Sequence, residues 1–564
     1  MIFLIELPIM RKTLWIFLFL FNLSLPAQTV GTLVYEDGIQ EGYTFFSPFS
    51  GTKAYLIDNC GRLINSWDRG TRPGLAAYFL DNGLMFRTYK PDPMGPFTSA
   101  SNSGGVELVD WDNNTVWQFE WNTPTQISHH DALYMPNGHV LLLTWELVYS
   151  PELIELGRNP NEIAPEGYMW SERILELEPV GTNDANIVWE WKIKDHYIQD
   201  FDSSKQGFGT IAEHPELFNI NLPELNSSNS NSTRDWNHFN SIDYNESLDQ
   251  ILLSVRNSDE IWILDHSTTT QEAASHTGGQ YGKGGDILYR WGNASAYNRG
   301  PVSDQKLFGQ HGVHWIQAGL NDAGKILIFN NGNGRPGPDY STAEILDPPQ
   351  DSLGFYTQSP SVAFGPATAE IVYGDQGGED FYSAYLSNAQ RLKNGNTLIN
   401  AGSPGRIFEV DPQRNQVWAY EIPLNGDTPA SQGQNPNNNS NFRAYKFTPD
   451  FPGFTGIDLA PGNTIEFGMN PINCEPSSAI FKPDVLTPDV RITWMPESHA
   501  IRISNPDAQD LDLQVYHVDG RRVLHQTGNS AEMQIPMQNH PPGSYLVRVA
   551  TNGRIFSDLF FIFN

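Results

Sequence analysis

The chain has 564 residues, enough for several hydrophobic cores or for one large closed repeat structure. Its 34 Lys and Arg residues stand against 65 Asp and Glu residues, so the formal charge is −31, and there is no long basic stretch. This acidity argues against nucleic acid and anionic membranes as partners. The 49 glycines, 39 prolines and 12% aromatic residues are typical of a turn-rich all-β protein rather than of a helical one.

Residues 1–27 have the pattern of a secretory signal peptide. Arg11 and Lys12 precede an apolar run over 14–21, and small or turn-forming residues follow up to Ala27, where we expect cleavage. A membrane anchor is the alternative, but the run is shorter than the roughly 20 residues of a spanning helix. Cys60 and Cys474 are the only cysteines, so the sequence indicates no disulfide framework and leaves open whether these two pair.

Two signatures recur through the middle of the chain. The first is a turn followed by an apolar strand, at 81–86, 136–142, 249–253, 323–328 and 393–399. The second is a strand with alternating aromatic residues, at 64–67, 116–119, 188–191, 288–291 and 417–420. Asn-Gly and Asp-containing tips suit hairpins, and aromatic side chains cover faces between packed sheets. Each repeat is therefore predicted to be a small antiparallel sheet.

Radial packing of these sheets around an axis predicts a six-bladed β-propeller. A single sheet of this kind cannot bury both of its faces, whereas sheets packed side by side around an axis can. We expect about six blades over 33–445, within a domain of 28–470, with insertions near 150–175, 195–232 and 335–380. Separate β-sandwiches are the alternative, but they give no reason for the regular aromatic spacing.

Three histidines occupy matching positions in three of these repeats. His130, His238 and His311 each lie just before a turn signature, and Arg256 follows closely behind His238. The innermost strands of a propeller line its axis, so these side chains are expected to converge there. Asn388 is a candidate for the same place in another blade. Position alone leaves a metal site, an anion site and a packing role open.

The sequences around these residues resemble those of the bacterial arylsulfate sulfotransferases. The matching motifs are His129-His-Asp131, Asp235-Trp-Asn-His-Phe-Asn-Ser-Ile-Asp243, Ser254-Val-Arg-Asn257, Gln310-His-Gly-Val-His314 and Ile328-Phe-Asn-Asn-Gly332. The similarity extends over most of 30–450. It implies a secreted six-bladed propeller that moves a sulfuryl group from a phenolic sulfate ester to an acceptor phenol without a nucleotide donor.

The resemblance also implies a role for each candidate residue. His311 would be the nucleophile that is transiently sulfated, while His238, Arg256 and either His129 or His130 would hold the sulfuryl oxygens. Neighbouring residues of a strand face opposite sides, so one of the two adjacent histidines is expected to point inward. We choose His130.

The chemistry of sulfuryl transfer favours the same set of residues. The reaction needs a neutral nucleophile, donors for three oxygens and a proton for the leaving phenolate, and a nearby Arg256 would lower the pKa of the nucleophilic imidazole. No cofactor and no metal at the catalytic site are expected, and a structural metal stays open. A histidine-ligated metal oxygenase is one alternative, although Arg256 would weaken binding of a cation. A non-catalytic surface-binding propeller is another.

A separate small domain is expected at the C-terminus. Residues 471–488 are typical of a linker, and alternating strands over 489–564 predict a β-sandwich. Its sequence is similar to the C-terminal sorting domains of type IX secretion, which implies that machinery as a partner and a secreted or cell-surface location. A carbohydrate-binding sandwich is the alternative. Related enzymes can form dimers, so a homodimer stays open.

Overall fold

The computed structural model describes residues 28–222, 234–375, 381–468 and, with gaps at 496–498, 505–509, 518–521, 538–540, 542 and 552–553, residues 491–562. The expected signal peptide over 1–27, the expected linker over 471–488 and Cys474 lie outside these residues. The chain divides into two units, Met1–Cys474 and Glu475–Asn564. The described chain is all-β, as predicted. Across the described ranges, no helix is both long and apolar enough to cross a membrane.

Six antiparallel sheets build the first unit. Their strands, each sheet given from its first strand outward, are β29 (Asn441–Phe447), β2 (Tyr43–Pro48), β3 (Lys53–Asp58) and β4 (Leu63–Asp68); β5 (Pro73–Phe79), β6 (Met85–Tyr89), β7 (Gly105–Val109) and β8 (Thr115–Glu120); β9 (Gln126–Tyr134), β10 (Val140–Tyr149), β11 (Tyr168–Val180) and β12 (Asp184–Lys192); β15 (Phe239–Asn245), β16 (Gln250–Val255), β17 (Glu260–Asp265) and β18 (Ile287–Trp291); β19 (His311–Trp315), β20 (Ile326–Asn330), β21 (Thr342–Leu346) and β22 (Glu370–Tyr373); β23 (Asn388–Arg391), β24 (Thr397–Ala401), β25 (Arg406–Val410), β26 (Gln416–Glu421) and β1 (Gly31–Tyr35).

Both repeated signatures form the strands predicted for them. The turn signatures lead into β6, β10, β16, β20 and β24, and the aromatic signatures lie in β4, β8, β12, β18 and β26. Gly138 and Gly395 stand at two of the hairpin tips with φ of +86° and +92°. Glycine adopts this left-handed conformation without the steric cost that a side chain adds, so the tips turn as the sequence indicates.

Tryptophans of the aromatic strands join each sheet to the next. The indole N–H of Trp67 on β4 donates to the backbone carbonyl of Asp110, beyond β7, and that of Trp117 on β8 donates to Asp184 on β12. Trp418 on β26 donates in the same way to Asn59, between β3 and β4. A buried indole needs a partner for its N–H, so the repeated tryptophan fastens neighbouring sheets as well as filling the space between them.

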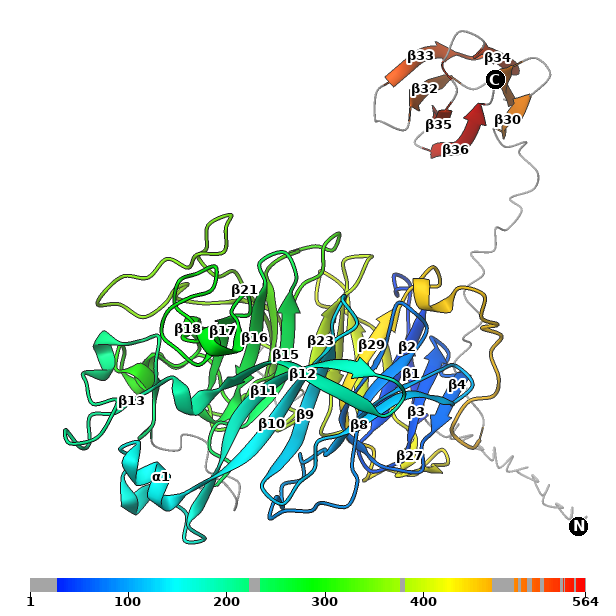
Figure 1. The fold of residues 1–564 in the computed structure, drawn as a ribbon. Helices are drawn as coiled ribbons and strands as arrows, with labels where there is room; N and C mark the ends of the chain where they lie inside the picture. The colour runs from blue at the N-terminus through cyan, green and yellow to red at the C-terminus, as the bar shows by residue number, and fades with distance from the viewer. Residues whose placement is uncertain are drawn as a thin grey trace, which may run out of the picture. The chain divides into compact units, whose positions relative to one another are not determined.

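The first strands of the six sheets contact one another in a circuit. β5 contacts β9, β9 contacts β15, and the series continues through β19, β23 and β29 back to β5. Figure 1 shows β9, β15, β23 and β29 in the middle of the unit. Strands from both ends of the unit take part, because β29 pairs with β2 and β1 pairs with β26. The first and last sheets are thus each completed by a strand from the opposite end of the unit.

Short elements lie between the sheets. They are α1 (Ser150–Glu155), η1 (Pro160–Glu162), η2 (Ile193–Asp195), η3 (Ile211–Glu213), η4 (Arg256–Ser258), α2 (Thr270–Ala273), η5 (Ala294–Tyr297), η6 (Val302–Asp304), η7 (Pro452–Phe454), the parallel pair β13 (Tyr197–Ile198) and β14 (Phe218–Asn219), and the hairpin β27 (Leu424–Asn425) and β28 (Thr428–Pro429). The first expected insertion, 150–175, ends earlier than predicted, since residues 168–175 already pair with β10.

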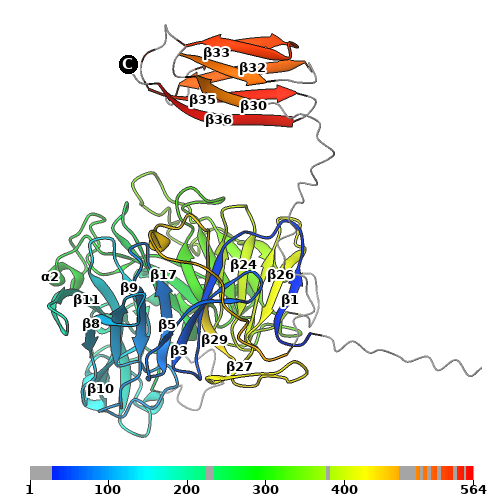
Figure 2. The same ribbon diagram turned by 90° about the vertical axis from the view of Figure 1, so that its right-hand side faces the viewer.

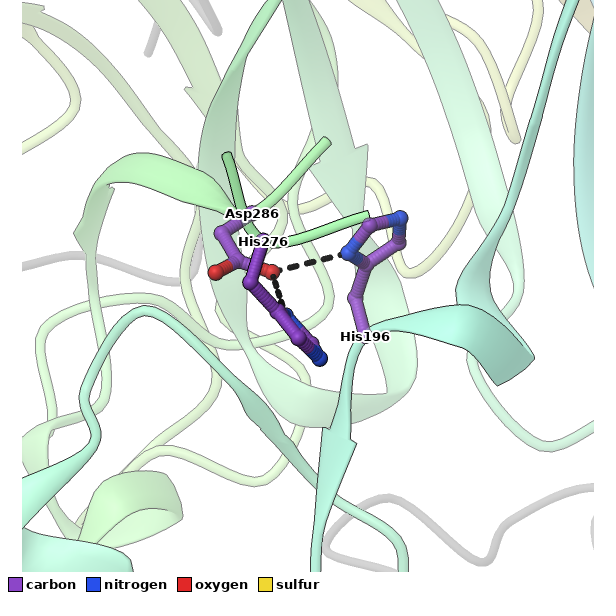
Figure 3. A group of neighbouring side chains, drawn as sticks. All are labelled: His196, His276 and Asp286. Carbon is purple, nitrogen blue, oxygen red and sulfur yellow. Dashed lines mark hydrogen bonds and ion pairs between the residues drawn. The ribbon is translucent and has the colours of Figure 1, made fainter. Parts of the chain in front are cut away.

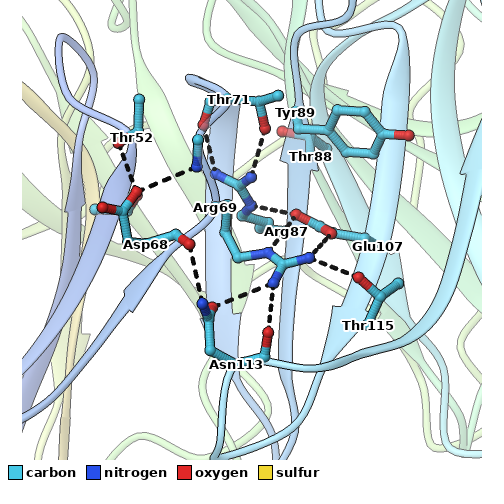
Figure 4. Close-up of polar contacts among 12 residues, drawn as sticks. Thr52, Asp68, Arg69, Thr71, Arg87, Thr88, Tyr89, Glu107, Asn113 and Thr115 are labelled. Carbon is cyan, nitrogen blue, oxygen red and sulfur yellow. Dashed lines mark hydrogen bonds and ion pairs between the residues drawn. The ribbon is translucent and has the colours of Figure 1, made fainter.

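A buried ion cluster stabilises the sheet of β5 to β8. Glu107 on β7 accepts hydrogen bonds from Arg87 on β6 at 2.7 Å and from Arg69, just after β4, at 2.8 Å. Figure 4 shows the two guanidinium groups meeting at this one carboxylate. Arg69 continues to the backbone oxygen of Asn113, so the cluster ties the end of β4 to the β7–β8 hairpin.

The second unit contains two antiparallel sheets that share one core (Figure 2). One consists of β30 (Arg491–Met495), β31 (Ala500–Ser504) and β34 (Glu532–Pro536), and the other of β33 (Arg522–Gly528), β32 (Leu511–His517), β35 (Gly543–Thr551) and β36 (Arg554–Ile562). Ile501, Ile503 and Ile535 from the first sheet lie in one buried cluster with Leu513 and Val547 from the second. The alternation predicted from the sequence thus gives each sheet one apolar face.

The Glu107→Gln substitution should destabilise the first unit. It leaves the buried Arg87 and the half-buried Arg69 without a carboxylate, and breaking a buried ion pair on one side costs about 3–5 kcal/mol. The free energy of unfolding, measured by urea denaturation, should fall by that order, while Glu178→Gln, at an exposed carboxylate of β11, should change it by less than about 0.5 kcal/mol. Equal free energies of unfolding for the two variants would show that the cluster of Arg69, Arg87 and Glu107 does not stabilise the unit.

Candidate functional site

The four predicted site residues lie where the first strands of three neighbouring sheets meet. His130 is on β9, His238 directly precedes β15, Arg256 directly follows β16, and His311 begins β19. β9 and β19 both contact β15, so the fold brings residues from 130 to 311 to one place. All four side chains are buried.

Left-handed residues bend the first strands at this place. His130 has φ of +48° and His238 of +55°, while Gly312 and Ser387 take +62° and +93° beside β19 and β23. The β9–β10, β15–β16 and β19–β20 pairings each shift register in the same region. A left-handed conformation costs a non-glycine residue roughly 1–2 kcal/mol, so the surrounding packing holds the two histidines in a strained backbone.

His129, His130 and His238 form a hydrogen-bonded chain between two carboxylates. The Nδ1 atoms of His129 and His130 are 2.9 Å apart, as are the Nε2 atoms of His130 and His238. His129 Nε2 contacts Glu172 at 2.9 Å, and His238 Nδ1 contacts Asp235 at 2.5 Å. Glu172 also accepts from the indole N–H of Trp145 and the backbone N–H of Phe239, which fixes its position.

This chain of three rings holds one proton more than three neutral imidazoles carry. Each contact to a carboxylate requires an N–H on the ring, and each contact between two ring nitrogens requires one proton between them. Four ring protons result, so one of the rings is an imidazolium. The pKa of His130 lies well below its usual value, because the ring is buried and the other histidines lie beside it. Burial and the neighbouring histidines therefore disfavour the extra proton on His130.

His311 is oriented by its Nδ1 atom. This nitrogen lies 2.9 Å from the carbonyl oxygen of Gly309 and 2.8 Å from Oδ1 of Asn331, both of which are acceptors. The amide of Asn331 is itself fixed, since its Nδ2 donates to the backbone oxygens of Ser383 and Leu386. Nδ1 must then carry the ring proton, which leaves the lone pair of the neutral ring on Nε2.

Burial and two cations keep His311 neutral. The pKa of His311 lies well below its usual value, first because the ring is buried and then because Arg256 and Arg443 lie near it; the hydrogen bond to Asn331 opposes this shift. The effect of Arg256 is in the direction that the sequence analysis expects, and burial adds to it.

Arg256 presents unused donors in this site. One of its N–H groups, on Nη1, donates to Oδ1 of Asn257 at 3.0 Å, and no other described residue accepts from its side chain. Burial lowers the pKa of Arg256, and Asp259 and Asp235 oppose that effect. A guanidinium with free N–H groups in a buried place is suited to hold an oxyanion.

Arg443 and Phe442 also belong to the site, and the sequence analysis missed both. Arg443 on β29 donates to the backbone oxygens of Ser387 and Asn240 and lies 3.6 Å from Asp131. The ring of Phe442 lies 6.5 Å from the rings of both His130 and His311. These two residues reach the site because β29 pairs with β2, a long-range pairing that leaves no local pattern in the sequence.

Two further expectations have a definite place in the structure. His130, the residue chosen from the adjacent pair, contacts His238, whereas His129 stacks on Trp145 with ring centroids 4.0 Å apart. The neighbouring Asp131 accepts from the hydroxyl of Tyr78. Asn388 begins β23, the matching strand of another sheet, and its side chain pairs with the backbone of Ala444 rather than with the histidines.

A group of side chains close enough together to hold a metal ion lies elsewhere in the described residues. His196, His276 and Asp286 form a group whose ligand atoms all lie within 4.8 Å of one another, and the central histidines form no such group with a carboxylate or cysteine. The central site combines two arginines with histidines bonded to each other, a set better suited to an anion than to a metal ion.

Two family models match this chain. The model described as Arylsulfotransferase (ASST) matches residues 117–432, more than half of the chain, and the model described as Secretion system C-terminal sorting domain matches residues 495–562. Both resemblances stated from the sequence are confirmed. A search of curated proteins finds no match.

Several solved structures are similar to parts of the chain. They include the β-propeller domain of Cps50 (Swd1) from Myceliophteria thermophila (9% identity, TM-score 0.31, covering 71% of this chain and 90% of that one), virginiamycin B lyase from Staphylococcus aureus (10%, 0.30, 70% and 89%) and a periplasmic gluconolactonase from Pseudomonas aeruginosa (9%, 0.33, 88% and 99%). These TM-scores are too low to support a conclusion about this chain.

Proposed function

This chain belongs to the arylsulfotransferase family, and we propose that it moves a sulfuryl group from a phenolic sulfate ester to an acceptor phenol through a covalent intermediate on His311. The family supports aryl sulfotransferase activity in general. The observation that carries the finer proposal is the orientation of His311, whose Nδ1 proton is held by two carbonyl oxygens so that the Nε2 lone pair is free beside Arg256.

We assign the catalytic domain to residues 28–470 and its fold to a six-bladed β-propeller. Six sheets whose first strands contact one another in a circuit support this fold, as does closure of the first sheet by β29. The remaining segments are the signal peptide over 1–27, the linker over 471–488 and a β-sandwich over 489–564. The shared core of the two sheets in the second unit supports the sandwich.

The first half-reaction transfers the sulfuryl group to the enzyme. His311 Nε2 attacks sulfur, the N–S bond forms, and the bond from sulfur to the aryl oxygen breaks. The ring becomes positively charged, and the carbonyl oxygens of Gly309 and Asn331 stabilise that charge through the Nδ1 proton. An imidazole can attack only as the neutral ring, which the low pKa of His311 maintains at neutral pH.

In this proposal Arg256, His238 and His130 hold the sulfuryl oxygens, and the Nε2 atoms of the two histidines leave their contact with each other when the substrate binds. Arg256 supplies the charge and the free N–H groups, and its guanidinium plane suits a tetrahedral anion. Loss of one such donor lowers turnover by about a hundred- to a thousand-fold.

The extra proton of the histidine chain serves the leaving phenolate. His238 donates this proton from Nε2, and the chain of His129, His130 and His238 then holds three ring protons, as three neutral imidazoles do. In the second half-reaction the acceptor phenol returns a proton to the chain, its oxygen attacks sulfur, and the N–S bond breaks. The cycle restores neutral His311 and predicts ping-pong kinetics without a nucleotide donor, a cofactor or a metal.

The alternatives lack comparable support. A metal oxygenase at the central histidines would place the cation beside Arg256 and Arg443, both of which repel it. A non-catalytic binding propeller gives no reason for a histidine whose tautomer is fixed by a doubly anchored asparagine.

The C-terminal sorting domain supports secretion and a cell-surface location. We propose the type IX secretion machinery as its partner and passage through the periplasm on the way. Assembly of the chain into a homodimer is left open. Nucleic acid is not expected as a partner, because the chain is strongly acidic.

The His311→Ala variant should lose sulfuryl transfer from 4-nitrophenyl sulfate to a phenol. The matched control is His314→Ala, which removes a half-buried imidazole from the same strand and should keep most of the activity. Mass spectrometry of the unaltered enzyme after incubation with donor alone should detect one sulfated histidine, at position 311. Activity of a folded His311→Ala variant would remove this residue from the role of nucleophile.

The Arg443→Gln variant should shift the pH dependence of transfer. A lowered pKa keeps His311 neutral, so activity falls only when the pH drops through that low pKa. Removing the Arg443 cation raises the pKa, so the acidic limb of kcat/KM should move to higher pH. The control is Arg87→Met, which removes a buried arginine that does not shift the pKa of His311. The acidic limb of kcat/KM should stay at the same pH in this variant. An unchanged acidic limb in Arg443→Gln would contradict the role of Arg443 in lowering the pKa of His311.

Removal of residues 485–564 should leave the enzyme in the periplasm with its transfer activity intact. The sorting domain has its own core, so the truncation spares the sheets that carry the site. Cell fractionation followed by the transfer assay measures both effects. Normal release of the truncated protein would rule out the sorting function.

A further inference from the structure

A second histidine cluster lies among the insertions between the sheets. His196 follows η2, His276 follows α2, and Asp286 directly precedes β18. Oδ1 of Asp286 lies 2.8 Å from Nδ1 of His196 and 2.8 Å from Nδ1 of His276 (Figure 3). The mechanism proposed above uses none of these residues.

His196 is held rigidly in this cluster. Its side chain is 1% exposed, and its ring lies parallel to that of Trp191 at 5.4 Å between centroids. Nε2 lies 2.7 Å from the backbone oxygen of Ala273, and a Cβ at Gly285 would come within 2.6 Å of the same nitrogen. The ring therefore has one position, and glycine at 285 is what makes room for it.

The bond to Ala273 decides which nitrogen of His196 is free. A carbonyl oxygen can only accept, so Nε2 carries the ring proton and the neutral ring turns its Nδ1 lone pair toward the carboxylate of Asp286. Two lone pairs 2.8 Å apart repel each other unless a proton or a metal ion lies between them. Histidines that bind metals have this same arrangement, with the second ring nitrogen donating to a carbonyl or a carboxylate.

We propose that His196, His276 and Asp286 bind a zinc ion that fastens the segment around η2 to the segment between α2 and β18. Two imidazoles and one carboxylate form a donor set that suits Zn²⁺, with water in the fourth position. The site goes beyond the proposed sulfuryl transfer and has a structural role.

The geometry fits zinc after a small movement. Bonds of about 2.0–2.1 Å in a tetrahedral site place two ligand atoms roughly 3.3 Å apart, so the 2.8 Å contacts must each open by about half an ångström. The side chain of His276 is 59% exposed and can make this movement, whereas those of His196 and Asp286 are buried. Solvent around His276 also provides the path by which the ion enters.

Zinc content and thermal stability test the proposal on the full chain without an affinity tag. After dialysis against Zn²⁺ and then against buffer, elemental analysis should find about one zinc per chain, and Tm should rise with Zn²⁺ and fall with a chelator. Loss of a residue that hydrogen-bonds to a metal ligand lowers metal affinity by roughly 10- to 100-fold. His276→Ala and Asp286→Asn each remove a ligand itself and should lower zinc affinity by more than that. His214→Ala, which removes an exposed histidine paired with Glu216, should bind zinc as the unaltered chain does.

Two results would overturn the zinc site. Absence of both bound zinc and a Tm response would mean that His196 and Asp286 form an ion pair with a protonated ring. Zinc bound by the His276→Ala/Asp286→Asn double variant would show that the metal binds elsewhere in the chain. Absence of bound zinc from His311→Ala would show that the metal binds at the central histidines. Sulfuryl transfer by His276→Ala should remain intact, so failure of the zinc site and failure of the proposed activity are separate outcomes.

Discussion

Pairing of β29 with β2 is the interaction on which the rest of the first unit depends. It completes the first sheet with the last strand of the unit and closes the circuit of first strands. The same strand carries Phe442 and Arg443 to the histidines, where Arg443 lowers the pKa of His311. β29 therefore contributes both to the circuit, through its contact with β5, and to the site, through Phe442 and Arg443.

The site combines cations with histidines by keeping their charges apart. His311 stays neutral because it is buried between two arginines, while the extra proton of the other three rings is confined between Glu172 and Asp235. In the proposed mechanism a nucleophile and an acid thus share one buried place without exchanging protons. The left-handed backbone at His130 and His238 is a cost of bringing these rings into contact, and packing of the surrounding sheets offsets it.

The second histidine cluster uses similar groups for a different purpose. Around His311 the neighbouring charges are positive and favour an anion, whereas His196 and His276 face a carboxylate and favour a cation. Two arginines near His311, rather than the number of histidines, distinguish the central site from this second cluster, although His129 and His238 also contact carboxylates. The same two cations disfavour a metal ion at the central histidines.

The sequence by itself determined the strands and the candidate residues, because alternation, hairpin tips and the motifs around His238 and His311 are local patterns that require no knowledge of distant contacts. It could not give Arg443, Phe442 or the anchoring of Asn331 by Ser383, since each contact joins residues far apart in the chain. The direction of His129 and His130 was also decided by tertiary structure. A left-handed residue interrupts the simple alternation of a strand, and only the packed sheets show where that residue lies.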